Sequence, residues 1–235
     1  MIRINIEQGS QEWHEARYRK IGGTASKGLF VDSETLVLEL LGKFLEDFEE
    51  VDGFISADME RGNELEPYAV KELNKYTGLI FNSVGWLQSE VNSLIGISPD
   101  GITDNDEASC EIKCPGRKKH TETILKNEIP KDNINQCLHY FIVNPKLKRH
   151  FFASFRPENN IKPLFVKELT RESIIDLGWK KKIEVEVLGA KGTPIKPKIV
   201  SVPDLKTINE WVEIAYKKAA EIQTQKNEAI KQLEF

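Results

Sequence analysis

Two carboxylates and one amine lie close together in the middle of the chain, at Asp100, Glu111 and Lys113. Hard cations such as Mg²⁺ take their ligands from carboxylate oxygens and from substrate phosphates. A cation held in this way can activate a water molecule and stabilise the charge that builds on a phosphate in the transition state. The lysine could orient or deprotonate that water, or neutralise the phosphorane. The three residues therefore predict a metal site for phosphodiester hydrolysis.

The elements around these residues explain how they could meet. Residues 109–114 are expected to form a strand, in which Glu111 and Lys113 share one face and the apolar side chains take the other. The proline before Asp100 cannot donate to a β-ladder, so Asp100 is expected at a strand end or bend. The turn-rich stretch 104–107 would bring it back beside Glu111. A Glu-x-Lys sequence by itself is often only a surface ion pair. The Pro-Asp upstream, the apolar opposite face of the strand and the turn between them favour the PD-(D/E)xK nuclease pattern.

Apolar periodicity predicts both helices and strands along the chain. Helices are expected from a Ser10 cap, from an Asp32 or Ser33 cap to Phe48, and over 58–76, 134–143, 171–187 and 204–235. Strands are expected at 80–87, 94–98 and 109–114, as a small antiparallel group, and at 151–155 and 163–169. This order predicts an α/β (α+β) fold with a central mixed sheet flanked by helices. The PD-(D/E)xK pattern implies that this sheet belongs to a restriction-endonuclease-like core. No linker is evident, so residues 1–235 are expected to form a single nuclease domain with a C-terminal helix.

Composition and charge exclude some classes of protein without choosing among the rest. No apolar run is long enough to cross a bilayer, and no signal pattern is seen, so a membrane partner is not expected. Three cysteines make a poor disulfide framework and fit a reducing cytosol. The net charge of −4 does not indicate a nucleic-acid binder. Basic clusters at 113–120, 146–150 and 180–182 could still focus a positive field in one cleft, or simply form solvated faces.

Four stretches resemble the phage lambda exonuclease family, also described as YqaJ-type viral recombinase nucleases. They are residues 7–17 with 23–26, residues 61–66 through 76–78, residues 98–101 with 111–115, and Gln136 with Tyr140. They follow the family's order and comparable spacing over roughly the first two-thirds of the chain. The combination is far more specific than the Glu-x-Lys core alone.

The resemblance implies an activity and a biological setting. Members hydrolyse one strand of linear double-stranded DNA in the 5′→3′ direction, processively and with Mg²⁺, leaving 3′ single-stranded overhangs for phage-type recombination. The resemblance also implies a homotrimeric ring, a single-strand annealing protein as partner, and a phage or prophage origin with action in the bacterial cytoplasm. Two Mg²⁺ ions are expected, with Mn²⁺ able to substitute.

The resemblance also assigns roles to individual residues. Glu66 would be a third metal carboxylate and the backbone carbonyl of Ile112 a further ligand, while Gln136 would join the catalytic group. The remaining assignments are contacts to the 5′-phosphate or to DNA, at Arg17, Ser26, Tyr140, Arg117, Lys118 and Lys119. Because Pro67 disfavours helical angles at the residue before it, a kink could aim Glu66 into the site or move it out, with Glu64 as the alternative.

Two rival interpretations remain open. One is a structure-specific or restriction-type endonuclease on the same core, and the other is a non-catalytic DNA-binding subunit. Three cysteines disfavour an iron–sulfur relative, which usually needs four. His120 and His139 are expected to be supporting or surface residues rather than bases, and Trp13 is expected in the core.

Overall fold

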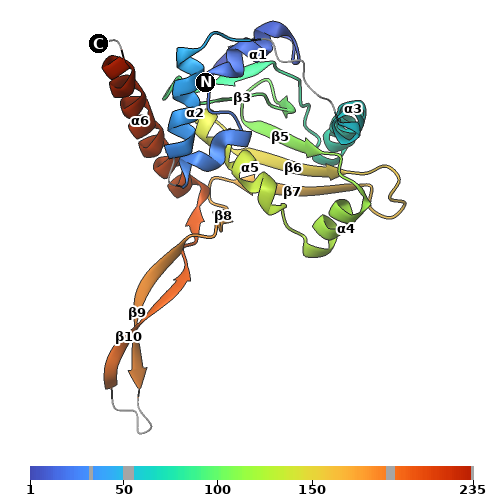
Figure 1. Ribbon diagram of the computed structural model, residues 1–235. Helices are drawn as coiled ribbons and strands as arrows, with labels where there is room; N and C mark the ends of the chain where they lie inside the picture. The colour runs from blue at the N-terminus through green and yellow to red at the C-terminus, as the bar shows by residue number, and fades with distance from the viewer. Residues whose placement is uncertain (32–33, 50–55, 189–193, 234–235) are drawn as a thin grey trace.

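A four-stranded mixed sheet lies at the centre of the protein, in the strand order β4-β5-β6-β7 (Figure 1). The computed structural model describes residues 1–31, 34–49, 56–188 and 194–233. The strands of the sheet are β4 (Gly101–Ile102), β5 (Ala108–Lys113), β6 (Arg149–Phe155) and β7 (Leu164–Thr170). β5 and β6 run parallel, whereas β4 and β7 are antiparallel to their neighbours. The predicted central mixed sheet is therefore confirmed, and β5 and β6 end at the same edge.

Helices cover both faces of this sheet and divide the apolar residues into two clusters. On one face, α3 (Ala57–Thr77) packs through Ala69 and Leu73 onto Cys110, Ile112 and other strand residues. On the other face lies the larger cluster, built with four further helical segments. These are η1 (Thr24–Leu29), α2 (Glu34–Leu45), α5 (Lys131–Val143) and α6 (Ile208–Leu233). Two shorter helices, α1 (Gln11–Tyr18) and α4 (Arg117–Lys126), complete the body.

Most of the predicted helices are confirmed, and their ends have local causes. The Ser10 hydroxyl accepts a hydrogen bond from the Trp13 N–H at 3.2 Å and caps α1. Gly78, with φ of +70°, ends α3. The expected caps of α2, Asp32 and Ser33, lie outside the described residues. No helix in the described part of the chain is long and apolar enough to span a membrane.

The prediction that the early strands form one antiparallel group is wrong. A separate antiparallel sheet contains β1 (Ile2–Ile4), β2 (Trp86–Gln88) and β3 (Gly96–Ile97), whereas β5 belongs to the central sheet. The bend at residues 98–100 explains the division, because Pro99 cannot donate to a ladder and the chain changes sheets there. The same bend places Asp100 directly before β4, as predicted.

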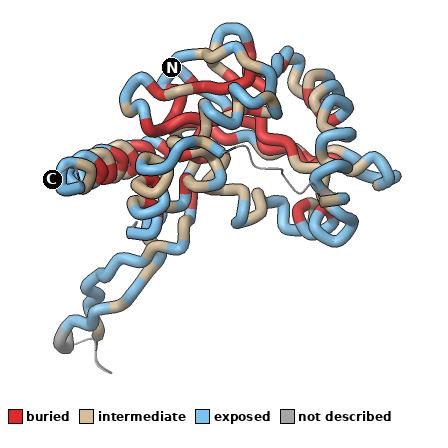
Figure 2. Tube along the Cα trace, turned by 45° about the horizontal axis from the view of Figure 1, so that its top comes forward, coloured by how far each residue is buried: buried red, intermediate tan, exposed pale blue. Residues whose placement is uncertain are grey.

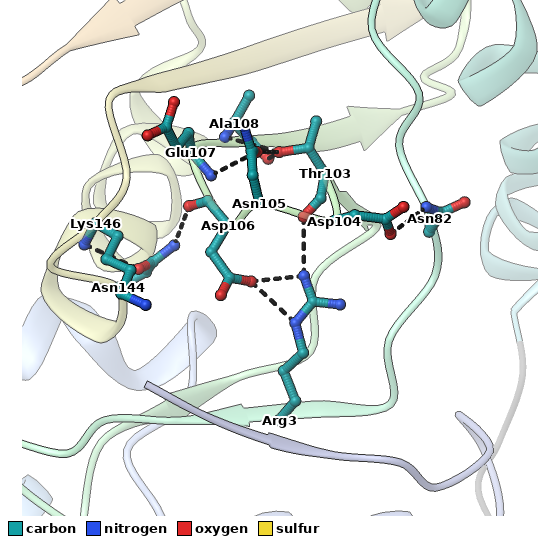
Figure 3. Close-up of polar contacts among 10 residues, drawn as sticks. All are labelled: Arg3, Asn82, Thr103, Asp104, Asn105, Asp106, Glu107, Ala108, Asn144 and Lys146. Carbon is teal, nitrogen blue, oxygen red and sulfur yellow. Dashed lines mark hydrogen bonds and ion pairs between the residues drawn. The ribbon is translucent and has the colours of Figure 1, made fainter.

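The turn that joins β4 to β5 is fixed from two other elements (Figure 3). Arg3 of β1 donates from Nε to Asp106 Oδ1 at 2.9 Å and from Nη2 to the Thr103 carbonyl at 2.8 Å. Asn144, at the end of α5, donates from Nδ2 to the Asp106 carbonyl at 2.7 Å. These contacts hold the predicted turn at 104–107 and so set the register that pairs Gly101 with Cys110.

The prediction of a helix over 171–187 is wrong. The segment contains β8 (Ile174–Ile175), which pairs with β11 (Lys206–Thr207), and β9 (Lys180–Leu188), which pairs with β10 (Pro194–Pro203). The alternation of apolar and charged residues at 183–187 has the period of a strand, and its apolar members are β-branched. We call β9 and β10 the arm. It extends away from the body and is largely exposed (Figures 1 and 2).

Candidate active site

Asp100, Glu111 and Lys113 meet at the edge of the central sheet where β5 ends. Glu111 is fully buried, and the Lys113 ammonium donates to its Oε1. Asp100 lies opposite in the bend before β4, and its Oδ2 accepts a hydrogen bond from the Ile112 N–H at 2.6 Å. Cys110 and Ile112 point into the α3 cluster, which confirms the predicted alternation along β5. The structure therefore brings the three predicted residues together.

Tyr140 joins the two carboxylates from α5. Its hydroxyl donates to Glu111 Oε2 at 2.8 Å and lies 3.4 Å from the Asp100 backbone N–H, which donates to it. Only 2% of Tyr140 is exposed, so its hydroxyl is committed to the carboxylate rather than open to a phosphate. Tyr140 therefore orients Glu111, and a contact between Tyr140 and DNA stays a prediction.

His150 is a supporting residue that the sequence did not reveal. Its ring lies 4.3 Å from the Tyr140 ring, centroid to centroid, and its Nδ1 lies 2.9 Å from the Ser109 hydroxyl. Burial lowers the pKa of His150 to about 3, so the ring is neutral. Its place in a basic run suggested surface charge, but Arg149 faces solvent and His150 faces inward by strand alternation.

The two histidines singled out earlier are also structural. His120 contacts the Ser154 hydroxyl at 2.8 Å and the Lys162 carbonyl at 2.9 Å. His139 Nε2 lies 2.9 Å from the Gly96 carbonyl, and burial lowers the pKa of His139 to about 4. Both rings are fully buried, which confirms a supporting role and rules out a surface one.

The electrostatics of the site favour a bound cation. Burial, and then the charge of Glu111, raise the pKa of Asp100 well above its usual value. For Lys113, burial lowers the pKa, but Glu111 and Asp100 together outweigh it, so the pKa rises and the ammonium form persists. One lysine thus faces two close carboxylates. Such a donor set fits a hard divalent cation, which would relieve the repulsion between Asp100 and Glu111.

Glu66 approaches the same group of charges from α3. Burial raises the pKa of Glu66. The charge of Lys113 lowers this pKa, and the charge of Glu111 raises it. Helix α3 runs through Pro67 without a break, and Glu66 is half-buried while Glu64 is exposed. The structure therefore favours Glu66 over Glu64. Among the described residues no three acidic, histidine or cysteine side chains form a ready-made metal cage, so water and substrate phosphate would have to complete the coordination.

The residues predicted to bind a 5′-phosphate lie on α1 and η1. The Arg17 guanidinium stacks 3.8 Å from the centre of the Trp13 ring and is half-buried. Ser26 is fully buried, and its hydroxyl donates to the Gly23 carbonyl at 2.6 Å inside the 3-10 turn. Ser26 would have to rotate its hydroxyl to reach an anion. That Arg17 and Ser26 bind a 5′-phosphate stays a prediction. Gln136 of α5 lies against this turn, since a Cβ added at Gly23 would stand 3.0 Å from its Cγ.

Trp13 of α1 and Gln8, which precedes α1, both hydrogen-bond to the bend that carries Asp100. Trp13 is only partly buried, contrary to a purely core role, and its Nε1 donates to the Ser98 hydroxyl at 2.7 Å. Gln8 Nε2 donates to the Pro99 carbonyl at 3.0 Å. Sequence reasoning missed both links, because they depend on side-chain contacts between segments more than 80 residues apart.

The predicted basic clusters are not gathered in one place. Arg117, Lys118 and Lys119 are exposed at the start of α4, a few residues beyond the end of β5, where they could meet DNA. Lys148 and Arg149 instead pair with glutamates, and Lys180–Lys182 lie on the arm. Of the basic clusters, only the first lies next to the carboxylates.

Because the carboxylates of Asp100 and Glu111 repel each other, we expect that replacing Asp100 changes the thermal stability of the protein. Asp100→Asn keeps an oxygen that can accept from Ile112 but removes one of the two close negative charges. Without divalent cations we expect the variant to melt at a higher temperature than the parent, by about 2–4 °C for each kcal/mol of repulsion removed. Because the pKa of Asp100 is raised on folding, this gain is largest above that pKa and fades as the pH falls through it. Thermal melts at several pH values check this, and an equal or lower melting temperature at every pH would contradict it.

Comparisons with known proteins establish the family and the fold of the chain. Residues 12–146, more than half of the chain, match the YqaJ-like viral recombinase domain. The fold is shared with LHK-Exo from Laribacter hongkongensis in complex with dAMP, at 21% identity and a TM-score of 0.65, over 95% of this chain and 98% of that one. A second structure of this alkaline exonuclease gives 22% identity and a TM-score of 0.58, over 95% of this chain and 100% of that one.

A third structure widens the comparison. It is a phage-related exonuclease from Haemophilus somnus 129PT, at 14% identity and a TM-score of 0.50, over 99% of this chain and 97% of that one. No curated protein matches the chain. Likeness at these identities concerns the fold, and it confirms the predicted mixed α+β class. Together with the domain match, the motifs around Asp100 and Glu111 establish that the chain belongs to the YqaJ-like viral recombinase family.

Proposed function

We propose that this protein is a Mg²⁺-dependent exonuclease that degrades one strand of linear double-stranded DNA from its 5′ end. The observation that carries the proposal is the meeting of Asp100, Glu111 and Lys113 at one sheet edge, with Glu66 close by, in a chain of this family. The solved proteins of like fold include exonucleases, and one of them holds a deoxynucleoside monophosphate. A site of the same kind here would release nucleotides from a DNA end.

The carboxylates of Glu66, Asp100 and Glu111, with the Ile112 carbonyl, would hold two Mg²⁺ ions, and Mn²⁺ would substitute. When bound, the cation supplies an activated water and neutralises charge on the scissile phosphate. Lys113 keeps its proton, so it serves as a cation and hydrogen-bond donor to the water or the phosphate rather than as a base. Tyr140 keeps Glu111 oriented.

The 5′ end of the DNA would bind beside the carboxylates. Arg17 presents a guanidinium that suits bidentate phosphate contact, and Ser26 would join it after rotating its hydroxyl. Gln136 lies on α5 against Gly23, one turn before Tyr140, and would contact the water or the phosphate. The exposed residues Arg117, Lys118 and Lys119 would hold the DNA backbone, which makes binding strongly dependent on salt.

The proposal also covers the assembly of the protein, its partner and its cellular location. The 235 residues would act as one nuclease domain within a homotrimeric ring that encloses DNA. The 3′ overhangs would pass to a single-strand annealing protein during phage-type recombination. The reaction would take place in the cytoplasm of a bacterial host.

Digestion of end-labelled DNA tests the proposal. With Mg²⁺, the protein is expected to shorten linear 5′-phosphorylated duplex from the 5′ ends, release nucleotides, and leave closed circular duplex intact. Excess chelator should stop digestion, and added Mn²⁺ should restore it. Cutting of the closed circle would replace the exonuclease by an endonuclease on the same core. Binding without any digestion under Mg²⁺ or Mn²⁺ would point to a non-catalytic subunit.

A further inference from the structure

A closed chain of side-chain contacts on one face of the central sheet ends at Glu111. Ser109 and Glu111 are two residues apart on β5, so their side chains share that face. Ser109 pairs in register with His150 of β6, and Ser109 Oγ lies 2.9 Å from His150 Nδ1. The His150 ring lies against the ring of Tyr140, whose hydroxyl donates to Glu111. The chain of contacts thus starts and ends on the same strand.

The Tyr140 hydroxyl in this chain touches both halves of the carboxylate site. It donates to Glu111 Oε2 at 2.8 Å and accepts from the Asp100 backbone N–H at 3.4 Å. Glu111 Oε1 is already held by the Lys113 ammonium. Metal-binding carboxylates depend on such hydrogen bonds for their orientation. Because the hydroxyl lies at the far end of the phenol, the tilt of the Tyr140 ring decides whether it reaches Glu111.

His150 fixes that tilt by packing against the ring of Tyr140. The two ring centroids are 4.3 Å apart, and the ring planes are 33° from parallel. Such a contact is at the short end of the range for aromatic pairs. The imidazole is itself held by the Ser109 hydroxyl and by the edge of Phe141, with 6.1 Å between the centroids of His150 and Phe141. All four side chains are buried in a close-packed interior, so the phenol has a fixed surface to lie on.

Packing alone does not explain a histidine at this position. Its Nδ1 meets Ser109, but its Nε2 is buried and contacts no hydrogen-bonding group of the described residues. Burying a polar atom is unfavourable unless it is hydrogen-bonded. A leucine would fill the same space without a polar atom, but it would offer Tyr140 no flat face. What the histidine adds is a flat ring whose plane is set by the contact with Ser109.

We propose that His150 is a positioning residue for the metal site, which holds Glu111 ready for a divalent cation through the ring of Tyr140. This inference rests on the proposed Mg²⁺-dependent function and adds a residue to which the motifs assign no role. Replacing a residue that orients a metal ligand typically weakens metal binding or activity by about 10–100-fold. His150 acts one contact further from the cation than Tyr140 does, so the loss should lie near the lower figure.

The test replaces His150 and Ser109 together. Removing both partners of a buried hydrogen bond leaves neither unpaired, so the fold should stay nearly as stable as the parent. Ser109→Ala/His150→Leu (the leucine variant) keeps the bulk but has no flat face, whereas Ser109→Ala/His150→Phe (the phenylalanine variant) keeps a flat ring. Binding of Mn²⁺ to the full chain without DNA is measured by electron paramagnetic resonance of the free ion, beside thermal melts without metal.

The two variants should differ in metal binding and not in stability. We expect the Mn²⁺ concentration at half-saturation to rise about tenfold in the leucine variant and to stay within about threefold of the parent in the phenylalanine variant. Both melting temperatures should lie within about 4 °C of the parent.

Tyr140→Phe shows whether the effect passes through the tyrosine hydroxyl. This variant alone should raise the half-saturating Mn²⁺ concentration by about 10–100-fold. Adding the leucine variant to Tyr140→Phe should change that concentration by less than about twofold, because no hydroxyl remains to be placed. A merely structural histidine would instead cause the same loss with and without the hydroxyl.

His120→Leu is the control for a loss of stability. His120 is equally buried, but its contacts are the Ser154 hydroxyl and the Lys162 carbonyl. We expect a lower melting temperature and an unchanged half-saturating Mn²⁺ concentration. An unchanged concentration in the leucine variant, a rise of about tenfold in the phenylalanine variant, or losses that add in the Tyr140→Phe background would overturn the role of His150 alone. A parent that binds no Mn²⁺ would instead overturn the proposed metal-dependent function.

Discussion

Lys113→Ala is expected to lower the rate of Mg²⁺-dependent digestion of linear duplex by at least about 10³-fold, and Asp100→Ala is expected to do the same. The lysine variant removes the ammonium that pairs with buried Glu111, and the aspartate variant removes a proposed metal ligand. DNA binding should survive in both, because the exposed basic residues that begin α4 remain. The measurements are initial rates with excess enzyme and binding to the same duplex in Ca²⁺.

The control for these variants is a second Lys–Glu pair on the same protein. Lys75 pairs with Glu72 at 2.7 Å on the exposed surface of α3, so Lys75→Ala removes an ion pair without touching the site. We expect it to leave the rate within about twofold, since surface pairs contribute little. Digestion near the parent rate by Lys113→Ala or Asp100→Ala would remove that residue from the catalytic group.

Arg17→Ala is expected to abolish the preference for 5′-phosphorylated ends. The parent should digest phosphorylated ends about 10–100 times faster than hydroxyl ends, since hydrogen bonds to a charged group contribute about 1.5–3 kcal/mol. In Arg17→Ala that ratio should approach one. Arg17→Lys should fall between the two, because it keeps a charge but loses the planar fork. The measurement is the ratio of initial rates on two duplexes that differ only in the 5′-phosphate.

Lys27→Ala provides the comparison for Arg17. Lys27 is exposed on η1 beside Ser26, so it reports the effect of removing any nearby positive charge. We expect it to weaken DNA binding modestly and to leave the ratio of phosphorylated to hydroxyl rates unchanged. A ratio that stays at the parent value in Arg17→Ala, or that falls equally in Lys27→Ala, would remove Arg17 from an end-reading role.

The catalytic strand was predictable from the sequence because its signals are local. The alternation over 109–114, the proline before Asp100 and the turn at 104–107 each act within a few residues, and all three are seen in the structure. The arm was not predictable in this way. Residues 171–187 contain enough apolar positions to suggest a helix, and the strand-like alternation at 183–187 is too short to outweigh them without the pairing to β10.

The contacts of the supporting residues were hidden for a related reason, although the resemblance did single out Tyr140. Tyr140 reaches Glu111 only because α5 crosses over the sheet, and His150 stacks on Tyr140 only because β6 returns parallel to β5. Neither contact can be predicted from the spacing of nearby residues in the sequence. By contrast, motif resemblance was sufficient for the family and the fold class.

The parallel pairing of β5 with β6 also dictates the order in which the site can be assembled. Asp100 and the Ile112 N–H belong to a short hairpin and can meet as soon as that hairpin forms. Ser109 and His150, in contrast, are 41 residues apart, so their contact waits for a slow closure of the intervening crossover. During synthesis the two carboxylates therefore stay in water at least until α5 and β6 have emerged, and the cost of burying them arises only after these two elements pack.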